Sequence, residues 1–165
     1  MWLKNTTKFK LNFFEMKFST QEEYGLRCLL RIARFHEMGK ALTIPEISRG
    51  EGISEHTTAK ILRALRLGGF IESARGHLGG YTLARSPQNI VVGNVLKELG
   101  GKLYDENFCS SHSKGDLLCT ITSDCSVRSL WVLIQNSVDN VIDGMHLSDL
   151  MGSQFTVATK VDSVV

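Results

Sequence analysis

Three cysteines in the second half of this 165-residue chain are the residues best suited to chemistry. Cys109, Cys119 and Cys125 are separated by nine and five residues. The amino-terminal region lacks the apolar stretch and cleavage site of a secretory signal, so we expect a cytoplasmic, reducing location. In such a compartment cysteines are more often metal ligands or redox sensors than members of a disulfide framework.

The fourth cysteine, Cys28, has a different setting. It stands four residues before Ile32 on the apolar side of an expected helix. Unpaired cysteines are among the most buried residue types. We therefore predict a buried structural thiol at this position.

A second group of polar and basic side chains is suited to binding a polyanion. Residues 1–90 carry a net charge of +6, whereas residues 91–165 carry −4. An uneven charge of this kind suggests that the basic half meets nucleic acid. The side chains that we expect to contact DNA are Thr43, Ser54, His56, Thr57, Lys60, Arg63, Arg75 and His77.

Three helices and a hairpin would position these side chains. Apolar residues at helical spacing predict a helix over residues 20–38. A capping box at residues 43–46 starts a second helix, and a third is expected over 54–67. Strands over 70–74 and 81–84 flank a turn with three glycines, which predicts a hairpin. This order of elements indicates a winged helix-turn-helix.

The third helix is expected to read DNA. The side chains that project away from its apolar stripe are His56, Thr57, Lys60 and Arg63, and the amino end of a recognition helix reaches base edges. Thr43 stands at a helix amino terminus, where free N–H groups favour a phosphate. Arg75 and His77 at the wing tip are expected to enter the minor groove or to clamp phosphates.

The second half of the chain is predicted to hold a short helix over residues 93–99, a long loop, and a helix over 126–143. The last helix carries an apolar stripe over about five turns, which is more than one small domain can cover. A helix from a second copy would cover it. The alternative is packing back on the first helix of the same chain.

The predicted fold class is mainly α with a small β-hairpin wing: a winged helix-turn-helix followed by a long C-terminal dimerisation helix. No apolar run is long enough to span a membrane. No nucleotide-binding, serine-hydrolase or zinc-protease motif is present, so an enzyme is not expected.

The expected parts are a disordered extension (1–15), the DNA-binding domain (16–86), a short helix with the cysteine loop (87–125), the dimerisation helix (126–151) and a flexible tail (152–165).

Several short stretches are more specific than the order of elements. The strongest is the wing sequence Arg75-Gly76-His77-Leu78-Gly79-Gly80-Tyr81. The others are Met16–Ser19, Tyr24–Arg27, Ile44–Ser48, Gly52–Ser54 and Leu62–Leu65. Over residues 16–152 the chain resembles the Rrf family of bacterial winged-helix transcriptional regulators. The resemblance implies a homodimer on a near-palindromic double-stranded DNA operator, with the long helix as its interface.

The resemblance also implies an iron–sulfur cluster, either 2Fe-2S or 4Fe-4S, held by Cys109, Cys119 and Cys125. Thiolates are the preferred ligands of such clusters. The chain would then sense redox state, nitric oxide or iron supply. The first cysteine gap is nine residues where five is usual in the family, but a longer loop adds little closure entropy.

The fourth cluster ligand stays open. Some relatives use a histidine three residues after the last cysteine, where this chain has Arg128. Glu23 matches the position at which other relatives offer a carboxylate from the partner subunit, and His112 is a local alternative. Asp116 and Asp124 are weaker candidates. A zinc site of the three cysteines with His112, or a cluster-free thiol switch, is the alternative to a cluster.

Overall fold

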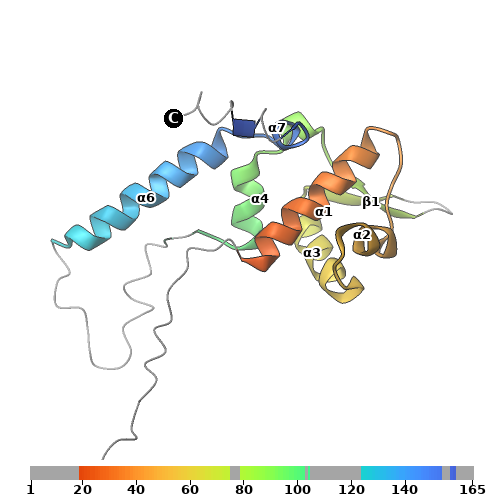
Figure 1. Ribbon diagram of the computed structural model, residues 1–165, viewed down its shortest axis with the longest axis horizontal. Coiled ribbons are helices and arrows are strands. Elements are labelled where there is room, and N and C mark those ends of the chain that lie inside the picture. Colours follow the sequence, from red (N-terminus) through yellow and green to blue (C-terminus); the bar gives the residue numbers. More distant parts are fainter. Residues whose placement is uncertain (1–18, 75–78, 103, 105–123, 154–156, 159–165) are drawn as a thin grey trace, which may run out of the picture.

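The computed structural model describes residues 19–74, 79–102, 104, 124–153 and 157–158. The elements in chain order are α1 (Thr20–His36), α2 (Ile44–Glu51), α3 (Glu55–Leu67), β1 (Ile71–Ala74), β2 (Gly80–Leu83), a 3₁₀ turn (Pro87–Asn89), α4 (Val92–Leu99), α6 (Ser126–Asp143) and α7 (Leu147–Leu150). Helices α1 to α3 and the antiparallel hairpin β1–β2 form a winged body, and α6 projects away from it (Figure 1). The predicted mainly α fold with a hairpin wing is confirmed.

Side-chain caps set the starts of the three helices in the winged body. The N-cap residues are Ser19, Thr43 and Ser54. Each accepts a first-turn backbone N–H with its hydroxyl oxygen, which stabilises a helix by about 1 kcal/mol. Gly52 ends α2 with a φ of 69°, a left-handed conformation that favours glycine. The chain can therefore turn sharply from α2 into α3.

One apolar core holds the winged body together. Its fully buried side chains include Leu29, Ile32, Ile47, Ile61, Leu62, Leu65 and Ile90. The hairpin joins this core through its base, because Ile71 pairs with Leu83 and both are buried. Farther out on the same face, Ser73 stands opposite Tyr81. The core therefore sets the position of the wing relative to α3.

The segment after α6 returns to the winged body. The Leu147 side chain is fully buried, and its N–H donates to the Ile90 carbonyl at 2.8 Å. The Val92 N–H donates to the Met145 carbonyl at 2.9 Å. The 3₁₀ turn between β2 and α4 packs against α7. The base of α6 is thus anchored to the body rather than loosely attached.

Helix α6 packs on α4 near its carboxyl end. Val141 and Ile142 join a small apolar cluster with α4, and Lys97 Nζ lies 3.0 Å from Asp143 Oδ2. Toward the amino end of α6 the large apolar side chains are exposed: Val127, Leu130, Trp131, Val132 and Leu133. In Figure 1 the amino-terminal part of α6 lies away from α1, beyond α4, so packing along the chain's own first helix does not cover these side chains.

Several predictions concern residues outside the described ranges. These are the extension 1–15, the wing tip with Arg75 and His77, and most of the cysteine loop. Within the described ranges, no helix has the length and apolar composition needed to cross a bilayer.

Candidate nucleic-acid interface

The exposed face of α3 carries three of the side chains predicted to contact DNA. His56, Lys60 and Arg63 are exposed, and their spacing of four and three residues places them in one row. The opposite face of the helix is buried in the core through Thr58, Ile61, Leu62 and Leu65. The exposed row, which we call the α3 row, has the polar and basic character of a helix that enters the major groove.

Ser54 and Thr57 are engaged in the cap of α3. Their hydroxyl oxygens lie 2.8 Å apart, and Ser54 Oγ accepts the Thr57 N–H at 3.2 Å. A hydroxyl has one proton and two lone pairs, so the cap leaves bonding capacity at both side chains. Their contact with DNA stays a prediction.

The amino terminus of α2 is already occupied by a carboxylate. The Thr43 N–H and Oγ1 each donate to Glu46 Oε2 at 2.8 Å. These bonds lower the pKa of the Glu46 carboxyl, the backbone N–H of Thr43 contributing most and Lys40 adding attraction. A DNA phosphate at Thr43 would compete with this negative charge. The phosphate contact predicted there remains a prediction.

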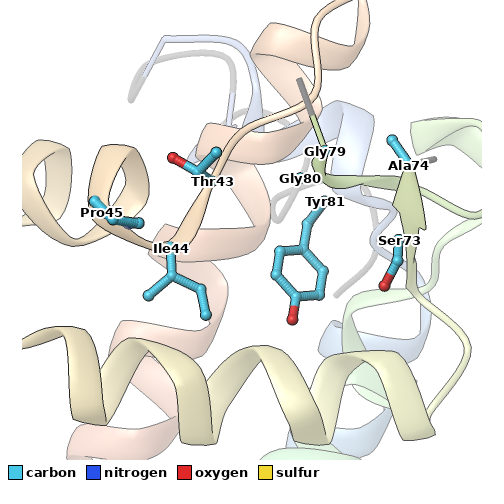
Figure 2. Close-up of a pocket in the computed structure, with 8 residues that line it drawn as sticks. All are labelled: Thr43, Ile44, Pro45, Ser73, Ala74, Gly79, Gly80 and Tyr81. Carbon is cyan, nitrogen blue, oxygen red and sulfur yellow. The ribbon is translucent and has the colours of Figure 1, made fainter. Parts of the chain in front are cut away.

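Two grooves lie beside α3. One lies between α3 and the first turns of α1, and its lining includes Thr20, Gln21, Tyr24, His56, Thr57 and Lys60. The other is a notch between the start of α2 and the outer part of the hairpin, shown in Figure 2. Its lining residues are Thr43, Ile44, Pro45, Ser73, Ala74, Gly79, Gly80 and Tyr81. Tyr24, Ser73 and Tyr81 were not among the residues predicted to contact DNA.

An ion-pair network between α1 and α2 was also missed from the sequence. The two carboxylate oxygens of Glu51 accept Arg27 Nε at 3.1 Å and Arg31 Nε at 2.7 Å. Arg31 Nη2 also donates to the Gly50 carbonyl at 2.7 Å, which satisfies a backbone group at the end of α2. Arg27 and Arg31 are one turn apart on α1, and this spacing could have predicted that they share a carboxylate partner. This network holds α2 against α1.

Of the three loop cysteines, the structure describes Cys125. It is the N-cap of α6, is half-buried, and its Sγ accepts the Arg128 N–H at 3.4 Å. N–H groups at a helix amino terminus favour negative charge, and hydrogen bonds to sulfur tune cluster sites. The setting of Cys125 therefore fits a thiolate ligand at the start of α6.

The other candidate ligands are not brought together within one chain. Glu23 is exposed on α1, and its Oε1 lies 3.5 Å from Arg27 Nη1. The start of α1 lies well apart from the start of α6 (Figure 1). Cys109, His112, Asp116 and Cys119 lie outside the described residues. In the part that the structure describes, no three His, Cys, Asp or Glu side chains form a metal site.

Cys28 is fully buried, as predicted, and burial raises the pKa of its thiol to about 12. The folded chain therefore keeps this proton above pH 9, where an exposed thiol, with its pKa of 9.0, loses it. Unfolding then releases a proton, so Cys28 lowers the free energy of unfolding as pH rises from about 9 to about 12, by up to about 1.4 kcal/mol per pH unit. Cys28→Ala will remove this component.

Urea unfolding at pH 8.0 and at two values above pH 9, on both proteins, measures the effect. The wild type should lose stability with pH more steeply than the alanine variant. Equal slopes would show that this thiol ionises at the same pH in the folded and unfolded chains.

The comparison with known proteins decides the family. A profile described as "Rrf2: Iron-dependent Transcriptional regulator" matches residues 18–153. The chain belongs to the Rrf2 family. It is 33% identical over 141 residues to Protein rrf2 of Nitratidesulfovibrio vulgaris, which covers 82% of this chain and 87% of that protein.

Two solved Rrf2-family structures resemble this fold. CymR of B. subtilis, described as the global cysteine regulator, superimposes with a TM-score of 0.65 at 29% identity and covers 82% of this chain and 96% of that one. IscR of T. potens has the same TM-score and identity, with coverages of 83% and 87%. The resemblance seen in the sequence is confirmed. As an Rrf2-family member the chain is a DNA-binding transcriptional regulator, not an enzyme.

Proposed function

We propose that this Rrf2-family regulator binds a near-palindromic operator as a homodimer and senses redox state, nitric oxide or iron through an iron–sulfur cluster. The observation that carries the DNA-binding half is the α3 row, which stands exposed on a helix whose other face is buried in the core. Arg75 and His77 at the wing tip would extend this surface into the adjacent groove.

The exposed stripe of α6 supports the homodimer. Five large apolar side chains near the amino end of α6 are between 38% and 64% exposed. Three of them, Val127, Leu130 and Trp131, share one face of the helix at helical spacing. Exposed apolar surface of this kind marks an interaction site, and a two-fold axis lets the same face cover itself. We assign residues 126–151 to dimerisation and residues 16–86 to DNA binding.

Cys109, Cys119 and Cys125 are the proposed cluster ligands, with Glu23 of the partner subunit or His112 as the fourth. The cluster would supply a redox- and ligand-sensitive iron centre. The description of the matched family as iron-dependent supports this assignment. Cys125 is the N-cap of α6, so the position of its sulfur is tied to the position of the helix.

Anaerobic purification followed by an absorption spectrum and analysis of iron and sulfide tests the sensor. A brown protein with visible bands, iron and sulfide supports the cluster. A colourless protein with stoichiometric zinc supports the zinc site instead, and a metal-free protein whose thiols oxidise reversibly supports the thiol switch.

Arg75→Ala will weaken binding to operator DNA by about 1–3 kcal/mol. The loss of one phosphate contact should also reduce the slope of log affinity against log salt by about one unit. Fluorescence anisotropy with a duplex from the region upstream of the gene, at several salt concentrations, measures both effects. Arg34→Ala, which removes an equal charge from the exposed last turn of α1, is the control. An unchanged salt slope in Arg75→Ala would argue against a wing contact.

A further inference from the structure

We propose that the notch between α2 and the wing binds the sugar–phosphate backbone of DNA, with the Tyr81 hydroxyl as hydrogen-bond donor to a phosphate oxygen. The proposal rests on the proposed DNA-binding function and adds a contact between the α3 row and the wing tip. Figure 2 shows the Tyr81 ring and Ile44 projecting into the notch above α3, with Ser73 on the far side.

The β register explains why two hydroxyls line the notch. Ile71 pairs with Leu83 and Ser73 pairs with Tyr81, and alternate residues of a strand share a face. The first pair is buried in the core, while Ser73 is exposed and Tyr81 half-buried. The face of the hairpin that packs on the core at its base therefore carries hydroxyl groups farther out, toward the wing tip. In the part of the chain that the structure describes, neither hydroxyl has a hydrogen-bond partner.

The backbone of Tyr81 is held in place from the segment before α2. Its N–H donates to the Leu42 carbonyl at 2.8 Å, and the Leu42 N–H donates to the Tyr81 carbonyl at 3.0 Å. A Cβ at Gly80 would lie 2.7 Å from the Leu42 oxygen, so a glycine permits this close approach. The two walls of the notch are thus bonded to each other, and a site arranged in advance loses less entropy on binding.

The next residue along the strand fixes the direction of the Tyr81 side chain. Thr82 Oγ1 lies 2.8 Å from His36 Nδ1 on α1, which ties the opposite face of the hairpin to α1. Tyr81 must then point the other way, toward the notch.

The nearby carboxylates are turned away from the notch. Glu72 pairs with Thr82 and so lies on the opposite face of the hairpin. Glu46 is bonded to Thr43 and lies 3.5 Å from Lys40 Nζ, in a neighbouring groove with Arg31 and Arg49. Among the described residues no carboxylate lines the notch. A phosphate on the hairpin side of the notch, beside Tyr81 and Ser73, therefore meets no carboxylate of the lining, whereas a phosphate at Thr43 would compete with Glu46.

The chemistry of the lining fits a nucleotide backbone. Hydroxyl side chains, including those of tyrosine and serine, are common donors to DNA phosphates. The apolar atoms of Ile44 and Pro45 at the opposite wall suit the face of a deoxyribose. When α3 lies in the major groove and the wing reaches the adjacent minor groove, the strand between the two grooves passes over this notch. Contacts of this kind position the protein and carry no base information.

Anisotropy with the full-length chain on two duplexes tests the proposal: DNA from upstream of the gene, and a random sequence of equal length at low salt. Tyr81→Phe should weaken binding about 3- to 10-fold on both duplexes, because one hydrogen bond is lost. The salt slope should not change, since a phenol neutralises no phosphate charge. Ser73→Ala, a second variant that keeps the aromatic ring, should weaken binding about 2- to 5-fold. Tyr104→Phe makes the same change at a buried tyrosine whose N–H donates to Gln135 of α6 and should leave binding unchanged.

The outcomes separate this contact from the broader function. If the wild type binds both duplexes and Tyr81→Phe, shown folded by its melting temperature, binds as tightly, the notch does not hold a phosphate. A loss confined to the upstream duplex would make Tyr81 a base-reading residue and would also overturn the proposal. If Tyr81→Phe does not fold, Ser73→Ala decides, and unchanged binding by that variant rejects the notch. A wild type that binds neither duplex would overturn the DNA-binding proposal itself.

Discussion

Trp131→Asp is expected to convert the proposed homodimer to a monomer and to weaken operator binding by at least about 100-fold. Trp131 lies in the exposed apolar stripe of α6 with Val127 and Leu130. A buried tryptophan contributes a large contact area, and interface side chains of this type each stabilise a complex by about 2–4 kcal/mol. In a two-fold interface the substitution occurs twice and places two carboxylates in an apolar contact.

The loss of DNA affinity follows from the loss of the second DNA-binding head. Two linked heads that engage two half-sites exceed the affinity of one head by about 10²–10⁴-fold. Sedimentation equilibrium reports the oligomeric state, and a gel shift with the upstream duplex reports the affinity. Asn136→Asp is the matched control because Asn136 is exposed on α6 and points about 140° away from Trp131 around the helix. A Trp131→Asp protein that remains dimeric with full affinity would place the dimer interface elsewhere.

Cys119→Ala is expected to abolish the visible absorbance of anaerobically purified protein and to remove nearly all bound iron. Thiolates are the preferred ligands of iron–sulfur clusters, so the proposed site, left with Cys109 and Cys125, should not retain the cluster. The winged body should stay folded, because its core is built from α1 to α4, the hairpin and Leu147.

Iron analysis, the visible spectrum and far-ultraviolet circular dichroism on the same samples separate cluster loss from unfolding. Cys28→Ala is the control, since that thiol is fully buried in the core of the winged body and should not affect iron content. Wild-type absorbance in Cys119→Ala would remove this residue from the ligand set. If the helical circular dichroism signal is lost together with the iron, the loop contributes to the folded core.

We propose that α6 couples the cysteine loop to the DNA-binding surface. Cys125 caps the start of α6, and the far end is anchored to α4 through the Lys97–Asp143 ion pair and to the body through the Leu147–Ile90 hydrogen bond. A helix with a fixed base transmits a displacement at its start. We therefore expect changes at Cys125 to alter the relative placement of the two winged bodies in a dimer.

Local patterns made the helices and the wing predictable. The predicted capping box at residues 43–46 is present, because this signal is complete within four residues. The third helix, Glu55–Leu67, also lies where it was expected. Helix α6 spans the predicted residues 126–143. Apolar residues that recur at helical spacing over many turns predict a helix, whatever packs against it. The α3 row was also predictable, because the helical period separates the polar residues on one side of α3 from the apolar residues on the other side.

Contacts between distant residues were decided only by the tertiary structure. Leu147 is fully buried against a body that begins more than one hundred residues earlier, and nothing in its own short helix distinguishes it from a surface leucine. The Glu51 network and the Leu42–Tyr81 bridge likewise join segments that no short window contains. The sequence by itself determined the family, the order of elements and the candidate ligands, because these depend on residue types and local spacing. Which hydroxyls line the notch, and where α6 is anchored, depend on how the elements pack, and packing is a property of the whole chain.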